Sequence, residues 1–552
     1  MFEEPLFQNN ILQTMAKYFY HYLTFDNWLI EYLAGIFFLY IIYKLITYKN
    51  LASYPHFTPS LKYSISWNTD KIGIFFALGC LSLYIINLYT QELSFFNNYD
   101  TMSYNTMLTF NQGVSPAWNQ YAGRFSPIGF WEVNILYAIS HNFQIINLFI
   151  LIQTLIIISL IYHLLDFIPS TKRLIIIGLF IISPSFFWIN TIIFPERMLI
   201  IYILCCFIYI KKYSQTQKSH QLWLSIFWLN LALYTKETTV LIFIGFLIYS
   251  FLYNLWNEKI TLKTFLHPIK TIKEFPLEFL IFISIIIFAV LYALHCSAIT
   301  QSPYAIERRG NLINTMMLYK YEIIILILSL IFYFKNHKTT LNNFLLNSML
   351  VGSLCYATVI IFVLNLIPTS PHVEMKPYYM ISACLCGLIY FIFQIKNKFI
   401  LILSTTLCFF SFLITDFNIY QNEEGKYHRK VAEFFSTQSS EDLSIFLAPN
   451  SETSLWNISC WNAVYKYYFP HKKIFFSAAI LQKDDMNTAL FKYWTRKYPY
   501  IFNPIATQAK PISNDFYIIK KRTNYQKDLD FIKDIPHKLI YQNQLFEVYK
   551  IK

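Results

Sequence analysis

Runs of apolar residues long enough to cross a lipid bilayer recur along most of this chain. A helix needs roughly 20 mostly apolar residues to cross about 30 Å of hydrocarbon. Inside lipid each backbone N–H and C=O must pair within its own segment, so the runs predict helices. They lie at about 28–48, 71–90, 143–168, 174–193, 197–210, 221–234, 238–256, 277–297, 320–335, 343–366, 378–395 and 399–416. The pattern predicts a polytopic α-helical membrane protein with about 12 spans.

Basic residues divide unevenly between the two sides of these spans. Up to residue 416, one set of alternating loops holds 17 Lys and Arg residues and the other set holds 8. Loops rich in Lys and Arg face the cytoplasm. The N-terminus, the loop at 91–142 and the tail from 417 are therefore expected outside, with the chain in the plasma (inner) membrane. The same bias explains much of the net charge of +13 without a nucleic-acid partner.

The tail at 417–552 has a different texture, because short apolar runs alternate with polar stretches. Such runs are typical of strands in a small soluble domain. We expect a helix at 426–436, strands at 444–448, 473–477 and 515–519, and a hairpin formed by 538–541 and 545–549. The sequence thus predicts two domains, a transmembrane domain at 1–416 and an extracytoplasmic α/β domain at 417–552.

Ionisable side chains collect at the loops and turns of the predicted outer face. Such groups are costly beside lipid, and those that persist tend to be functional. They fall into five groups: Asp100, Tyr104 and Arg124 in the loop at 91–142; Glu196 and Arg197; Lys236 and Glu237; Glu307, Arg308 and Arg309; and His372, Lys376 and Tyr378. Because all five groups share one face, we interpret them as parts of one site.

Each group also has an ordinary structural alternative. Asp100 can be a base or a metal ligand, or a helix cap or a solvated loop acid. Glu196 can simply stabilise a helix N-terminus. Lys236 can bind a phosphate as a point charge, or pair with Glu237, or extend to the interface. The arginines can bind a lipid phosphate or ordinary headgroups, and Tyr378 can belong to the interfacial aromatic belt.

Together these residues resemble the GT-C glycosyltransferases, membrane enzymes that use polyprenyl-phosphate sugars. The resemblance extends to the protein O-mannosyltransferases, the aminoarabinose transferases that act on lipid A and the O-antigen glucosyltransferases. Asp100, followed by Tyr104, looks like the acid that these enzymes carry in the first large outer loop. Gly123-Arg124 is similar to loops of the O-antigen type.

Later segments extend the resemblance towards the C-terminus. Phe194-Pro195-Glu196-Arg197 looks like the second acidic turn of the family, and Tyr234-Thr235-Lys236-Glu237 is similar to its Lys-Glu turn. The segment from His372 to Tyr379 resembles the one that opens a late span. The chain differs by its extra span at 28–48. It also has the single Asp100 where many members have an acidic pair, which leaves open whether a divalent metal is needed; no cofactor is certain.

The resemblance implies inverting transfer of a sugar from a polyprenyl-phosphate donor to a hydroxyl of a lipid- or glycan-linked acceptor. Asp100 would be the general base, and Glu196 would position the acceptor or the base. The donor phosphate would be bound by Arg124, Lys236, Arg308, Arg309 and Lys376. The remaining pocket residues would be Tyr104, Arg197, Glu237, Glu307, His372 and Tyr378.

Other classes of membrane protein remain open. An O-antigen polymerase or ligase also has many spans and a large outer loop with arginines. A transporter or lipid flippase typically carries mid-span charges and helices broken by Gly or Pro. Mid-span charge is scarce in this chain, and only 12 of the 552 residues are Gly, which favours an enzyme. A structural or assembly protein could use the outer domain for binding.

Overall fold

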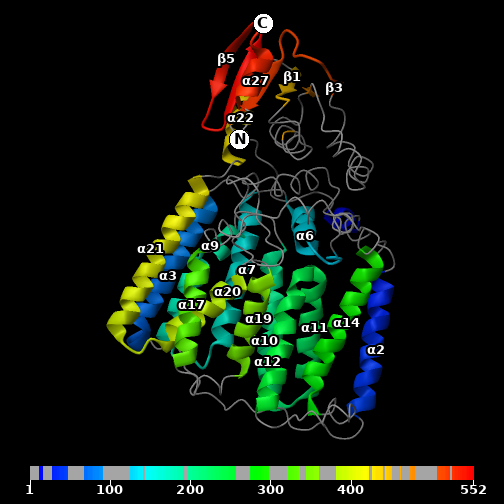
Figure 1. Ribbon diagram of the computed structural model, residues 1–552, viewed down its shortest axis with the longest axis vertical. Helices are drawn as coiled ribbons and strands as arrows, with labels where there is room; N and C mark the ends of the chain where they lie inside the picture. Colours follow the sequence, from blue (N-terminus) through cyan, green and yellow to red (C-terminus); the bar gives the residue numbers. More distant parts are fainter. Residues whose placement is uncertain are drawn as a thin grey trace.

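The computed structural model describes most of the helical part of the chain and most of the C-terminal sheet. The described residues are 11–16, 28–47, 67–90, 125–140, 143–189, 195–256, 274–296, 320–335, 344–359, 381–421, 425–438, 442–449, 461, 473–478, 506–521 and 525–552. Figure 1 shows a bundle of helices with a smaller sheet domain beyond one end of it.

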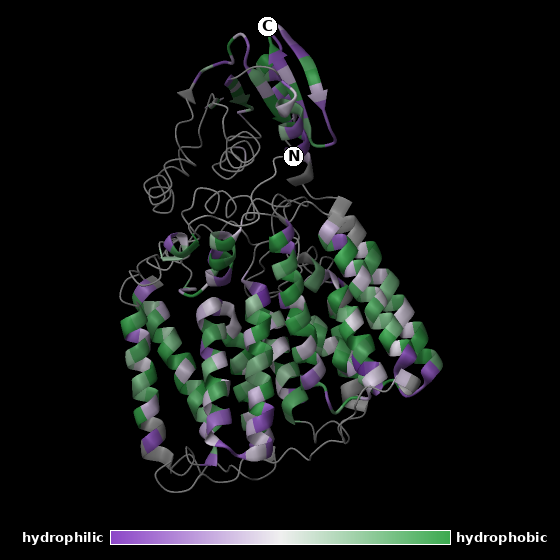
Figure 2. Ribbon diagram, turned by 180° about the vertical axis from the view of Figure 1, so that it is seen from behind, coloured by the Kyte–Doolittle hydropathy of each residue, from purple (hydrophilic) through white to green (hydrophobic). Residues whose placement is uncertain are grey.

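Helices occupy each of the predicted apolar runs. They are α2 Trp28–Thr47, α3 Trp67–Thr90, α6 Trp131–Ile139, α7 Phe143–Leu164, α8 Ser170–Ile181, α9 Pro184–Trp188, α10 Glu196–Thr216, α11 Ser219–Thr235, the 3-10 helix η1 Glu237–Thr239, α12 Val240–Trp256, α14 Pro276–Cys296, α17 Lys320–Lys335, α19 Phe344–Thr358, α20 Ile381–Gln394 and α21 Lys398–Gln421. In the described part of the chain, six helices are long and apolar enough to cross a membrane. Apolar residues cover the lengths of the helices, and polar residues gather at their ends (Figure 2). The chain is a multi-pass helical membrane protein with a C-terminal α/β region, as predicted.

The predicted span at 174–193 is wrong as a single helix. α8 ends at Ile181, and a separate short helix, α9, begins at Pro184 with Ser183 as its cap. Proline lacks the N–H that would continue the helix, and it disfavours helical geometry at the residue before it. The Ser183 side chain instead accepts a hydrogen bond from the Phe186 backbone N–H. The apolar run therefore bends at this point instead of crossing straight.

Two further boundaries differ from the predictions. α10 runs to Thr216 and has the length of a membrane span, whereas the sequence predicted a short helix at 197–210. Within the predicted loop at 91–142 lies a nine-residue helix, α6. Both differences matter for the site, because α10 and α6 carry buried acids.

Close helix packing in the bundle depends on glycine. Gly245 of α12 and Gly352 of α19 face each other, and a Cβ added to Gly352 would lie 2.5 Å from the Ile242 backbone oxygen. Small residues allow such close approach between membrane helices. Asn347 of α19 adds a polar link, because its amide donates to the Tyr249 hydroxyl of α12 over 2.9 Å. α12 and α19 are thereby held as one unit.

At one end of the bundle, basic side chains cap the C-termini of helices. Lys172 donates to the carbonyls of Phe393 and Ile395, over 2.8 and 2.6 Å, at the end of α20. Arg173 donates to the Ile168 carbonyl over 3.1 Å, beyond the end of α7. α21 starts at this end and runs to the opposite end, where α22 and the sheet follow (Figure 1). We call that opposite end the sheet-facing end; α10 and α20 begin there.

The C-terminal region contains a six-stranded sheet with the order β3-β2-β1-β4-β6-β5. The strands are β1 Asp442–Leu447, β2 Lys473–Ala478, β3 Ala506–Thr507, β4 Phe516–Lys520, β5 His537–Gln542 and β6 Phe546–Ile551. β1 is parallel to β2 and β4, whereas β6 is antiparallel to β4 and β5. The helices α22 Gly425–Ser436 and α27 Tyr525–Ile532 also belong to this region. The predicted helix, three strands and hairpin are confirmed.

Gly352→Leu should destabilise the bundle strongly, because the new side chain would meet the backbone of α12. Overpacking of this kind costs about 1–3 kcal/mol or more. The matched control is Gly79→Leu on α3, where an added Cβ meets nothing within 4 Å. Thermal unfolding of the two purified variants in detergent tests this, and equal melting temperatures would contradict it.

Candidate functional site

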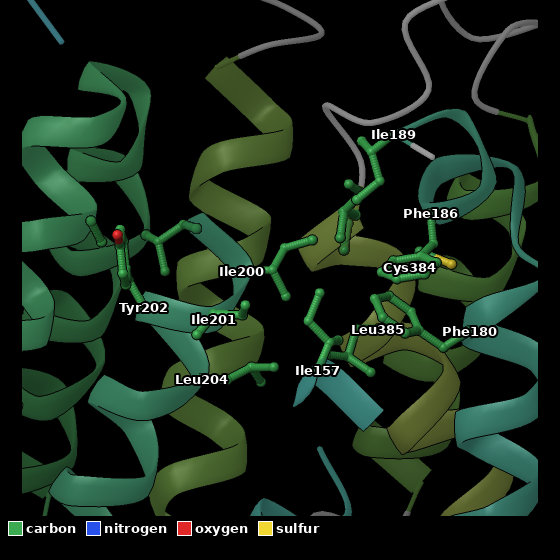
Figure 3. Packing of buried hydrophobic residues seen from close by; sticks show 14 of the residues in the cluster. Ile157, Phe180, Phe186, Ile189, Ile200, Ile201, Tyr202, Leu204, Cys384 and Leu385 are labelled. Carbon is green, nitrogen blue, oxygen red and sulfur yellow. The ribbon is translucent and has the colours of Figure 1, made fainter. Parts of the chain in front are cut away.

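A cavity lies between α8, α10, α12, α19 and α20 at the sheet-facing end of the bundle. It has a volume of about 80 Å³. Its lining is formed by Phe180, Glu196, Leu199, Ile200, Ile203, Leu204, Phe207, Lys236, Thr239, Ile242, Met349, Ser353, Tyr356, Ile381, Ser382, Leu385 and Cys386. Ile200 and Leu204 of α10 approach Leu385 of α20 across the packed interior (Figure 3). Most of the lining is apolar, and the polar groups gather where α10 and α20 begin.

The main polar feature of the cavity is a buried ion pair. Glu196 is the first residue of α10, and Lys236 lies in the extended link between α11 and η1. The Lys236 ammonium donates a hydrogen bond to Oε1 of Glu196. The two residues are only 4% and 8% exposed. The pair joins two helix ends, and the α10 N-terminus further stabilises the carboxylate.

Three buried oxygens around the cavity have no hydrogen-bond partner among the described residues. They are Oε2 of Glu196, Oγ1 of Thr239 and Oγ of Ser382. A buried polar atom left without a partner costs about 1–3 kcal/mol, so such atoms are rare in native proteins. All three residues line the same cavity. Their grouping points to a ligand with polar groups at this end and apolar groups along the rest.

Arg197 points to the scaffold and does not line the cavity. Its Nε donates to Oε1 of Gln153 on α7 over 2.8 Å, and Nη1 donates to the Ile189 carbonyl just after α9. Arg197 is 4% exposed. It therefore fixes the start of α10, and with it Glu196, against α7 and the short helix α9.

A second buried acid, Glu132 on α6, was missed by the sequence analysis. It is 4% exposed and lies within electrostatic range of Arg197 and Glu196. Burial raises the pKa of the Glu132 carboxyl to about 7, with Glu196 raising it further and Arg197 opposing the shift. α6 is held in place because Trp131 donates to the Tyr202 hydroxyl of α10 over 2.8 Å. A lone acid among apolar and aromatic residues in the loop at 91–142 was the available signal.

The described structure contains four of the predicted site residues. It brings Glu196 and Lys236 into direct contact, and Arg197 lies behind them. Glu237 opens η1 and is half-buried. The other predicted residues lie outside the described residues: Asp100, Tyr104, Arg124, Glu307, Arg308, Arg309, His372, Lys376 and Tyr378. In the described ranges, no group of three or more His, Cys, Asp or Glu side chains is placed to hold a metal.

The fold can be compared with solved structures. The crystal structure of ArnT from Cupriavidus metallidurans bound to undecaprenyl phosphate aligns with a TM-score of 0.47 at 9% identity, over 87% of this chain and 98% of that one. The apo state of ArnT aligns with a TM-score of 0.44 at 9% identity, over 86% and 98%. No protein-family model and no curated protein matches the sequence. At such low identity and TM-scores below 0.5, activity and ligands must be argued from this chain's own residues.

Lys236→Met should lower the stability of the protein, because it leaves the Glu196 carboxylate buried beside the cavity without its counter-ion. Removing one partner of a buried ion pair costs about 3–5 kcal/mol. The double variant Glu196→Gln/Lys236→Met should recover much of this loss, since no lone charge remains. Lys398→Met, at an exposed position, is the control. Thermal unfolding in detergent measures the effect; a double variant no more stable than Lys236→Met would argue against a buried ion pair.

Proposed function

We propose that this chain is an integral membrane glycosyltransferase of the GT-C type. It would move a sugar from a polyprenyl-phosphate donor to an acceptor hydroxyl. The observation that carries the proposal is the cavity, which is apolar along most of its lining and ends in a buried Lys236 with unpartnered polar atoms beside it. A polyprenyl phosphate has the same division, with a long apolar chain attached to one anionic head.

In this proposal the apolar lining receives the start of the prenyl chain. Hydrocarbon gains little free energy by moving from lipid to an apolar cavity, because lipid tails are as apolar as the side chains. The lining therefore selects for shape, and the anionic head supplies the affinity. An ammonium group interacts with a phosphate far more strongly in a buried site than in water. Lys236 is thus the main candidate for holding the donor.

Hydroxyl groups and helix ends support an anion at the same place. Thr239 and Ser382 each have a buried hydroxyl without a partner among the described residues. Ser382 lies in the first turn of α20, where backbone N–H groups and the helix dipole favour negative charge. Lys236, Thr239 and Ser382 come from three separate stretches of chain, so the fold assembles them around the cavity.

The proposed chemistry is an inverting displacement at the anomeric carbon. The bond from that carbon to the phosphate oxygen breaks, its electron pair leaves with the phosphate, and the acceptor oxygen bonds from the opposite face. Lys236 would stabilise the charge that develops on the phosphate, together with Arg124, Arg308, Arg309 and Lys376. Asp100 would take the acceptor's proton, which requires approach to about 2.6–3.2 Å. Glu196 would hold Lys236 and offer Oε2 to the acceptor.

The domain arrangement and location are part of the proposal. The division at 416/417 would separate a transmembrane catalytic domain from an extracytoplasmic α/β domain. Basic caps such as Lys172 and Arg173 lie at the end of the bundle away from the sheet, which supports a cytoplasmic position for that end. The sheet and the cavity's polar end would then both lie on the outer side of the plasma (inner) membrane, where a lipid- or glycan-linked acceptor would be met.

A lipid flippase is the second candidate, and one observation favours it. The helix break between α8 and α9 at Ser183-Pro184 lies close to the cavity, since Phe180 of α8 lines it. Broken helices beside a central site are typical of transporters. Both candidates need a polyprenyl-phosphate site, and only the transferase needs a general base.

Binding of undecaprenyl phosphate tests the site that both candidates share. Met349→Trp should fill the cavity and reduce the retention of the lipid at least tenfold in native mass spectrometry. The matched control is Leu407→Trp, on the lipid-facing side of α21, where Leu407 is 60% exposed. Lys236→Met should instead remove the preference for undecaprenyl phosphate over undecaprenol, since only the phosphate needs the ammonium. Equal retention by all variants would refute the site.

Asp100→Asn should abolish sugar transfer, because an amide cannot accept the acceptor's proton. Expression, membrane insertion and undecaprenyl phosphate binding should be unchanged. Transfer is measured as loss of sugar from a polyprenyl-phosphate donor in membranes that contain the full chain. Unchanged transfer by the variant would remove Asp100 from the mechanism, whereas lipid movement without transfer by the wild type would favour the flippase.

A further inference from the structure

Four charged residues form a buried cluster where α6, α10 and the turn before η1 meet. They are Glu132, Glu196, Arg197 and Lys236, which are 4%, 4%, 4% and 8% exposed. The cluster holds two acids and two bases. With all four ionised, the empty site is neutral overall, which makes its burial tolerable.

The two acids are held differently. Glu196 accepts a hydrogen bond from the Lys236 ammonium. Glu132 faces Arg197 and Glu196, both on α10. Arg197 directs its hydrogen bonds to Gln153 and the Ile189 carbonyl and also lies within electrostatic range of Tyr84 of α3.

The environment of Glu132 places its titration in the physiological range. α6 is nine residues long and is not a candidate span. Tyr202, the hydroxyl neighbour of Trp131, is the other titratable group facing Glu132 among the described residues. Since burial raises the pKa of this carboxyl to about 7, Glu132 is partly protonated at neutral pH. Glu132 is therefore the member of the cluster whose charge can change.

We infer that Glu132 takes up a proton when an anionic lipid headgroup binds beside Lys236. An anion added to the neutral cluster leaves an excess negative charge in a poorly solvated place, and a nearby like charge favours the neutral form of an acid. Glu196 stays ionised because Lys236 holds it. The inference rests on the proposed phosphate site and adds to it a positioning residue that links anion binding to pH.

Linkage gives the direction of the effect. Above pH 7 the empty site has Glu132 ionised, so binding must bring in a proton, and affinity falls as pH rises. The fall is at most about tenfold per pH unit when one whole proton is taken up. Below pH 6 Glu132 is already protonated, and its contribution to the pH dependence disappears. At pH 7 the uptake should be about half a proton.

The test is calorimetric titration of the full chain in detergent with undecaprenyl phosphate at pH 7.5. Parallel titrations in two buffers of different ionisation enthalpy give the number of protons taken up. Wild type should take up a fraction of a proton more than Glu132→Gln, a neutral and nearly isosteric variant that should still bind. A phosphate monoester titrates near pH 6, but this contribution is common to all variants and cancels in the difference.

Glu278→Gln is the matched control. Glu278 is an acid of α14 that accepts a hydrogen bond from Ser250, at the far end of the bundle from the cavity. It should behave like wild type in both buffers. Equal proton uptake by wild type and Glu132→Gln, with binding intact, would overturn the inference and leave the proposed function standing. Absence of binding by the wild type would overturn both.

Discussion

Lipid offers no hydrogen bonds, and this absence governs how the chain is built. A polar group at membrane depth must find its partner inside the protein. The helices satisfy their own backbone, and side chains such as Asn347 find partners on neighbouring helices. Lys172 and Arg173 serve the carbonyls that helix ends leave open. Against this background, the three buried oxygens without partners around one cavity stand out, and they give the strongest reason to place a ligand there.

The same constraint connects the break in the apolar run at 174–193 to the site. Ending α8 early and starting α9 at Pro184 leaves carbonyl groups that need donors, and Arg197 supplies one at Ile189. Successive residues on a helix point about 100° apart. Arg197 can therefore bind the scaffold while Glu196 faces the cavity and Lys236. One adjacent acid–base pair thus fixes the start of α10 and furnishes the site.

Much of the fold could be predicted, because apolar runs and alternating patterns are local signals. The helices of the bundle and the strands of the tail follow from them. The break at Ser183-Pro184 was missed because an average over 20 apolar residues hides a two-residue signal. The partner of Lys236 was also beyond local reasoning. Its sequence neighbour Glu237 was the obvious choice, yet Glu196, 40 residues earlier, is the acid that the fold brings to it.

Glu132 shows why the rest of the site could not be predicted from sequence. Its residue type is ordinary, and what makes it distinctive is burial by α10 and its neighbours, which is a property of packing. A charge-balanced cluster with one adjustable acid suits the proposed reaction. The donor is a phosphodiester with one negative charge, whereas the leaving lipid phosphate carries up to two. The extra charge appears beside the cluster during transfer, and proton uptake by Glu132 would offset it. A site made only of fixed charges would match the donor or the product, but not both.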